Sequence, residues 1–168
     1  YNNIEILQNI YNSFKDKIDI NAVLLLAAEK SSITILKSLY AEFKDIIDIN
    51  ATLMTAVRNN TNIKVIELLY NTFKDTIDIN QQNSDGYTTL MLAVWFSINV
   101  KTVQYLCDAF KDTVDISIQD NDGNTALMLA AKNKNEQVIE YLCDTFKDKI
   151  DINKRNNDGN TALMIAAY

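Results

Sequence analysis

The side chains of this chain that could do chemistry are its carboxylates, its lysines and two cysteines. The sequence holds 22 Asp and Glu residues and 16 Lys and Arg residues, but no histidine. Histidine is the commonest general base near neutral pH and the commonest metal ligand, so its absence is informative. Gly-x-Gly-x-x-Gly, Walker-type and Cys-x-x-Cys patterns are also missing. The sequence therefore predicts no enzyme, no catalytic site, no metal and no cofactor. A site built from carboxylates or lysine alone is the remaining enzymatic alternative.

The two cysteines occupy equivalent places in a repeated pattern. Cys107 and Cys143 are 36 residues apart, and tyrosines hold the same place in the other units. Equivalent residues in stacked helices lie roughly 8–10 Å apart, and a disulfide allows about 7 Å between Cα atoms. We therefore expect both cysteines to pack in the core and not to do redox or metal chemistry.

Composition narrows the class of partner. The 168 residues carry a net charge of −6, with a pI of about 4.6. A nucleic-acid interface needs a basic stripe that neutralises phosphates, and none is visible. Acidity also argues against an anionic membrane surface, and no apolar run approaches the roughly 18 residues of a membrane span. The predicted partner is another protein.

The first residue is Tyr1 and not a methionine. We therefore expect a piece of a longer protein, with any targeting segment outside these residues. The location in the cell stays unknown, with an intracellular one favoured.

One phrase recurs along the chain: Phe-Lys-Asp, a variable residue, Ile or Val, then Asp-Ile. Its copies begin at Phe14, Phe43, Phe73, Phe110 and Phe146, in steps of 29, 30, 37 and 36 residues. Self-similarity at this period indicates a repeat protein. The paired Lys and Asp residues of the phrase form a ladder of mixed charge, which is typical of a solvated face.

The last complete unit shows the anatomy. The Asp122-Gly123 pair predicts a tight turn, and residues 126–131 are an unbroken run of helix formers. After a polar turn, a second helix follows with apolar residues at helical spacing: Val138, Ile139, Leu142, Cys143 and Phe146. The units that end at Phe43 and Phe73 keep both helices but lack about seven residues at the turn. We therefore expect projecting turns only in the carboxy-terminal half.

These units predict one domain over residues 1–168, an all-α solenoid of stacked helix pairs. Its expected divisions are a partial repeat at 1–20, short repeats at 21–49 and 50–79, full repeats at 80–116 and 117–152, and a partial repeat at 153–168. A helix pair this small cannot bury its apolar faces alone, so stability must come from stacking on neighbours.

The sequence from Asp122 to Ala131 resembles the D-G-x-T-P-L-H-x-A-A core of ankyrin repeats, and Asp151-Ile152-Asn153 is similar to the end of their G-A-D-V-N. Methionine replaces the family's His throughout, at Met54, Met91, Met128 and Met164. We expect these methionines to be packed. The resemblance implies a helix–turn–helix solenoid, with β-turn fingers, whose concave face binds a partner protein.

Aromatic residues that break the repeat are the candidate binding site. Tyr87 follows the Asp85-Gly86 turn, while Trp95 and Phe96 directly follow the expected first helix. The resemblance places turn tips and first helices on the concave face, and Trp and Tyr are enriched where interface energy concentrates. We predict a patch centred on these three aromatic residues and flanked by Arg58, Asn59, Asn121, Asn124, Lys132 and Asn133.

Two alternatives stay open at this point. Trp95 and Phe96 could instead fill the space vacated by the missing turns of the shorter units. The module could also be structural and assemble with itself as a homo-oligomer through exposed repeat faces. Tyr168 falls at the position equivalent to Trp95.

Overall fold

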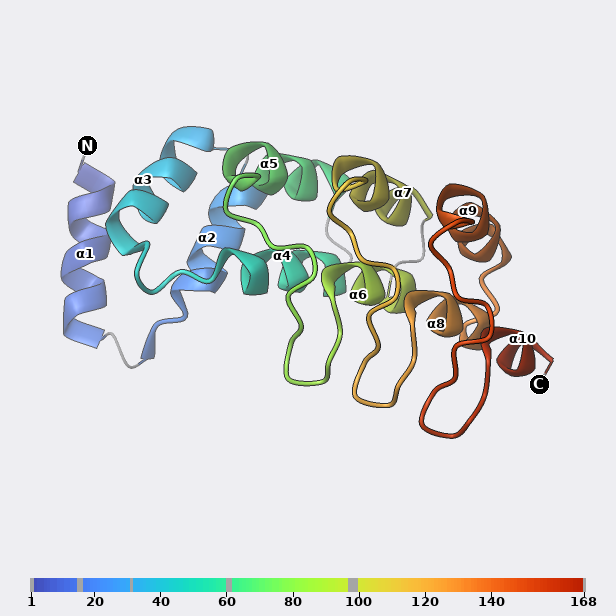
Figure 1. Cartoon of the computed structure of the whole chain (residues 1–168). Coiled ribbons are helices and arrows are strands. Elements are labelled where there is room, and N and C mark those ends of the chain that lie inside the picture. Colours follow the sequence, from blue (N-terminus) through green and yellow to red (C-terminus); the bar gives the residue numbers. More distant parts are fainter. Residues whose placement is uncertain (1, 15–16, 31, 60–61, 97–99, 168) are drawn as a thin grey trace.

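The computed structural model describes residues 2–14, 17–30, 32–59, 62–96 and 100–167, and every regular element in them is a helix (Figure 1). None of these helices is long and apolar enough to cross a membrane. Their bounds are α1 Asn2–Phe14, α2 Ile20–Glu29, α3 Ile33–Phe43, α4 Ile49–Arg58, α5 Ile63–Phe73, α6 Thr89–Phe96, α7 Val100–Ala109, α8 Ala126–Lys132, α9 Glu136–Phe146 and α10 Ala162–Ala166.

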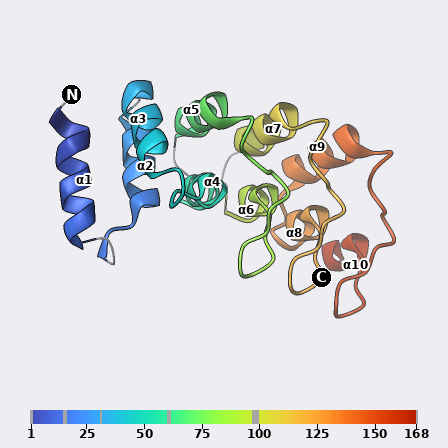
Figure 2. The same ribbon diagram turned by 60° about the vertical axis from the view of Figure 1, so that its left-hand side comes forward.

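The helices stack in two rows. The first helices of the units, α2, α4, α6, α8 and α10, form an inner row, and α3, α5, α7 and α9 form an outer row (Figures 1 and 2). Contacts between α2 and α4, α4 and α6, α6 and α8, and α8 and α10 make the inner row continuous. At one end, α1 joins the stack through Tyr11, whose ring lies edge-on to that of Phe43 at 5.0 Å. The predicted all-α solenoid of helix pairs is confirmed.

Two kinds of N-cap explain why some units have a projecting turn. In the short units, the Asp of the Asp-Ile phrase itself caps the next helix: the side chains of Asp19 and Asp48 accept hydrogen bonds from the first backbone N–H groups of α2 and α4. In the longer units Thr125 and Thr161 cap α8 and α10 instead. A cap of this kind stabilises a helix by about 1 kcal/mol. Because the Asp of the Asp-Ile phrase is itself the N-cap in the short units, the first helix begins directly after it. The short units therefore lack the projecting turn and still have a capped helix.

Three loops project on one side of the inner row, before α6, α8 and α10 (Figure 1). We call them the fingers, residues 80–88, 117–125 and 153–161. Each contains an Asp-Gly pair whose glycine has a φ of 80–81°, a left-handed conformation that favours glycine. For the residues that the structure describes, the prediction that such turns occur only in the carboxy-terminal half is confirmed.

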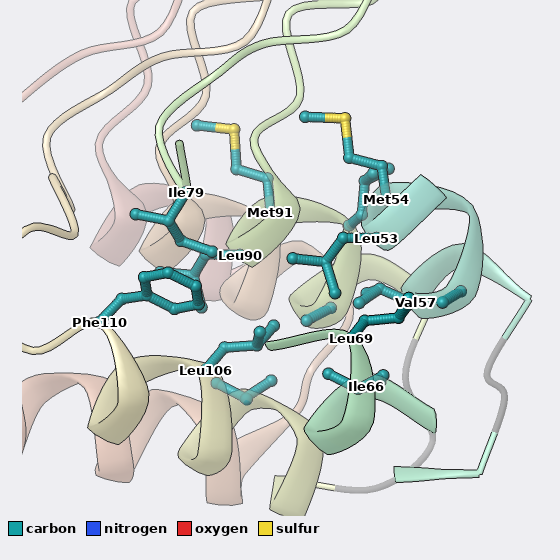
Figure 3. Close-up of a cluster of buried hydrophobic side chains, with 14 of the residues drawn as sticks. Leu53, Met54, Val57, Ile66, Leu69, Ile79, Leu90, Met91, Leu106 and Phe110 are labelled. Carbon is teal, nitrogen blue, oxygen red and sulfur yellow. The ribbon is translucent and has the colours of Figure 1, made fainter. Parts of the chain in front are cut away.

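The core is a band of aliphatic side chains between the two rows. Leu53 on α4, Leu90 on α6 and Leu106 on α7 are at most 2% exposed (Figure 3). Met54 and Met91 extend from the inner helices away from the outer row and are buried. Packing of the methionines is thus confirmed for these two and for Met128. It is wrong for Met164, which is 42% exposed on α10, the last helix of the described residues.

Hydrogen bonds of asparagine side chains join neighbouring units. The Oδ1 atom of an asparagine accepts the backbone N–H of the Asp in the following Asp-Ile phrase: Asn21 from Asp48 at 2.9 Å, Asn50 from Asp78 at 2.9 Å and Asn80 from Asp115 at 2.8 Å. We call this set the asparagine ladder. The next unit has Ser117 in the equivalent place, and its hydroxyl bonds locally to Asp115. Asn153 follows one unit further on.

Replacing Asn80 should weaken the stack. Its side chain makes two bonds to the next unit, since Nδ2 also donates to the carbonyl of Thr113 at 2.7 Å. Asn80→Ser should lower the free energy of unfolding in urea by about 1–2 kcal/mol. Asn153→Ser is the matched control, because no bond of that side chain to another unit is found in the described residues, and its effect should stay under about 0.5 kcal/mol. Equal losses in the two variants would contradict the ladder.

Candidate partner-binding site

Trp95 and Phe96 are the last two residues of α6. The expectation that they follow the helix is therefore wrong by two residues. Asparagine ends the neighbouring helices, since Asn59 is the C-cap of α4 and Asn133 that of α8. Phe96 stands in the same place, and as a large apolar residue it lacks the preference of asparagine for a helix end.

The two aromatic rings lie between two cations on adjacent helices. The Arg58 guanidinium, at the end of α4, is 5.7 Å from the centre of the Phe96 ring. The Lys132 ammonium, at the end of α8, is 5.5 Å from the Trp95 ring. Trp95 is half-buried and packs against the core, whereas Phe96 is 40% exposed. Contacts of this kind contribute about 0.5–1 kcal/mol at exposed sites. These four residues form the cation–aromatic cluster.

Asn133 ties the cluster together from α8. Its Nδ2 donates to the backbone carbonyl of Trp95 at 3.0 Å, a carbonyl that lies beyond the reach of helical hydrogen bonding. Asn133 was predicted to flank the contact surface, and it is exposed. Its side-chain amide also stabilises the end of α6 through this hydrogen bond. Asn59 is exposed at the end of α4. Tyr168 lies outside the described residues.

The finger residues of the predicted patch differ in what a partner could reach. Tyr87 is half-buried, and desolvation, followed by the charges of Asp120, Asp122 and Asp85, raises the pKa of its hydroxyl. Asn121 is exposed, and its Nδ2 donates to the Ser84 carbonyl of the preceding finger at 2.9 Å. Asn124 is only 4% exposed.

Asn124 holds its finger in shape. Its backbone N–H donates to Asp120 Oδ1 at 2.7 Å, and its own Oδ1 accepts from Asn156 of the next finger at 2.9 Å. It was predicted as a flank of the contact surface, but its burial puts it out of a partner's reach. A polar residue in a turn does not reveal in sequence whether its amide faces solvent or the next finger.

Sequence reasoning missed Lys134. Together with Lys132 it lines a groove of about 440 Å³ between the inner helices and the last two fingers, whose carboxylates Asp122 and Asp158 lie on the other wall. Lys134 has a positive φ of 53° in the turn between α8 and α9. Its position in the polar turn between the two helices of a unit could have indicated an exposed lysine beside Lys132.

The remaining chemistry-bearing groups are used by the scaffold. Cys107 is buried and Cys143 half-buried, and both are free thiols. Burial raises the pKa of Cys107 to about 12 and also raises that of Cys143. Among the residues described, no three His, Cys, Asp or Glu side chains gather closely enough to hold a metal ion. The Lys-Asp pairs after α3, α5, α7 and α9 are exposed, and Lys15-Asp16 lies outside the described part.

The fold and this surface define a class of protein: an α-solenoid with finger turns, built of units that stack only on their neighbours. A family model described as "Ankyrin repeats (3 copies)" matches residues 24–120 and 109–168. The chain belongs to the ankyrin-repeat family. A search of curated proteins finds no match to it. Ankyrin repeats are generally protein–protein interaction modules, and the family match points to no enzyme.

Contact between fingers predicts unequal effects of alanine at two equivalent glycines. A Cβ on Gly123 would lie 2.7 Å from the backbone N of Asn157 in the next finger, whereas one on Gly159 would meet nothing within 4 Å. Both have positive φ, so Gly159→Ala should cost about 1–2 kcal/mol from backbone strain alone. Gly123→Ala should cost more, measured as the free energy of urea unfolding. Identical losses would show that the fingers do not support each other.

Thiol labelling should separate the two cysteines. The thiolate is the reactive form, and both raised pKa values keep it scarce at pH 8. We expect Cys143 to react slowly with a maleimide in the folded protein and Cys107 at least about tenfold more slowly, because it is fully buried. In urea both should react at similar rates. Prompt labelling of Cys107 without denaturant would contradict its place in the core.

Proposed function

We propose that this chain binds a partner protein through the concave face formed by its fingers and inner helices. The observation that carries the proposal is Phe96: an aromatic ring, 40% exposed, at the end of an inner helix where the neighbouring units have asparagine. A ring whose only role is packing in the core would be buried at this position. An exposed ring with the Arg58 guanidinium over it is suited to contact another protein.

The contacts of the neighbouring Trp95 and of the fingers support this proposal, because they hold the surface next to Phe96 in one arrangement. Trp95 is fixed by Lys132 and by the bond from Asn133 to its carbonyl. The fingers are joined by the bond from Asn121 to Ser84. Binding to an ordered surface loses less conformational entropy than binding to a mobile one. The proposed contact residues are Arg58, Asn59, Tyr87, Trp95, Phe96, Asn121, Lys132 and Asn133, with Asn124 as an internal support.

We also propose that the chain is not an enzyme. Three of its carboxylates serve the backbone: Asp19 and Asp48 cap helices, and Asp120 holds the second finger. A carboxylate that is occupied by backbone N–H groups is a poor candidate for general acid–base work.

Self-assembly is the competing proposal, and the end helices of the chain favour it. Phe14 on α1 is 56% exposed and Leu163 on α10 is 73% exposed. Apolar side chains in such positions could stack on another copy. Sedimentation equilibrium separates the two proposals: a mass that rises with concentration supports assembly, and a monomer at every concentration speaks against it.

Truncating Phe96 should remove binding without unfolding the protein. Phe96→Ala should weaken capture of the partner from a lysate of source cells by roughly tenfold or more, the loss expected for an interface hot spot. Ile46→Ala is the matched control, because Ile46 is 49% exposed in the turn between α3 and α4. Circular dichroism should show both variants to be equally helical. Retention of the partner by a folded Phe96→Ala variant would contradict the proposed surface.

A further inference from the structure

Charges on the concave face are sorted by position. Arg58, Lys132 and Lys134 are exposed at or just after the ends of inner helices. Asp85, Asp122 and Asp158 are exposed at the tips of the fingers. The eight residues of α6 span about 12 Å between its finger and its end. The face therefore has a row of carboxylates at the finger tips and a basic edge along the helix ends, and the third finger also carries Lys154 and Arg155 before its tip.

The basic edge is unexpected in an acidic chain, and the described part of the chain offers it no acidic partner. The net charge is −6, yet within the described residues no carboxylate lies within ion-pair distance of Arg58, Lys132 or Lys134. The first helix of the amino-terminal short unit, α2, ends in Glu29 with Lys30 as its C-cap, so a carboxylate and a cation lie side by side there. The part of the edge that is basic alone therefore begins at α4.

The aromatic rings orient two of these cations. Arg58 lies over Phe96, and Lys132 lies over Trp95. A cation on a ring face has its direction fixed, and its remaining N–H groups stay free for a carboxylate. Between the two cations, the exposed part of the Phe96 ring offers an apolar contact.

From this arrangement we propose that the segment bound here is an acidic peptide of a partner protein, with carboxylates on either side of a large apolar residue. The carboxylates pair with Arg58 and Lys132, and the apolar side chain packs on Phe96. The proposal rests on the proposed function and specifies its ligand.

The spacing of the cations constrains such a segment. Arg58 and Lys132 are on α4 and α8, two steps along the inner row, and helices that pack together are about 8–10 Å apart, so the cations are roughly 15–20 Å apart. An extended chain advances about 3.3 Å per residue, which places the two carboxylates about five or six residues apart. The carboxylates at the finger tips, Asp85, Asp122 and Asp158, repel the same segment on the other side, so it should follow the helix ends.

Selection from a library of random 12-residue peptides displayed on phage, with this chain as bait, tests the proposal. Enriched peptides should carry net negative charge and an aromatic or large aliphatic residue between carboxylates. A synthetic copy of one enriched peptide, measured by fluorescence anisotropy, should bind at least tenfold more weakly to the double variant Arg58→Glu/Lys132→Glu. Its affinity should also fall as salt concentration rises.

The control carries the same change of charge on the outer row. Lys37 on α3 and Lys64 on α5 are exposed, so Lys37→Glu/Lys64→Glu should leave affinity within about twofold of the wild type. Neutral or basic enriched peptides, an absence of enrichment, or equal losses in the two double variants would overturn the proposal. So would tight binding of a 20-residue oligothymidylate in place of peptides, since aromatic rings with cations also bind single strands.

The two experiments distinguish a wrong ligand from a wrong binding surface. If Phe96→Ala releases the cellular partner while the selection yields no acidic peptide, the concave surface stands and the acidic ligand is wrong. If Phe96→Ala retains the partner, the surface itself is wrong.

Discussion

The structure depends on one constraint: no helix pair in this chain can bury its apolar side chains without a neighbour. Leu53, Leu90 and Leu106 are buried because α4, α5, α6 and α7 enclose them together. The polar groups at the boundary between units are satisfied in the same way, since Asn50 and Asn80 accept N–H groups of the following unit. Burial and hydrogen bonding thus both act between neighbouring units, and each unit supports the next.

Stacking also determines how the proposed binding surface arises. Equivalent positions of successive units lie side by side. A residue that departs from the repeat in one unit therefore lies between the equivalent residues of the two adjacent units. Trp95 and Phe96 replace a Lys-Asn or Arg-Asn pair in α6, and the cations Lys132 and Arg58 of the adjacent units then lie over their rings. The fingers add a second wall where Thr, and not Asp, caps the helix.

The amino-acid sequence was sufficient to predict the features that each repeat forms within itself, namely its helices and its finger. The Phe-Lys-Asp phrase and the Asp-Gly pairs predicted helix pairs and three fingers, because helical periodicity and turn chemistry act within a few residues. It was insufficient where the partner of a side chain lies in another unit. Asn124 and Asn121 look alike in sequence, but one is buried in its finger and the other is exposed. The pairing of cations with rings likewise depends on how α4, α6 and α8 are placed.

Amide hydrogen exchange of the chain, alone and with a captured partner, tests the central claim most directly. We expect slower exchange on binding at the ends of α4, α6 and α8 and along the fingers, with the outer helices α7 and α9 unchanged. Protection confined to α7 and α9, with unchanged exchange around Phe96, would contradict a concave binding face.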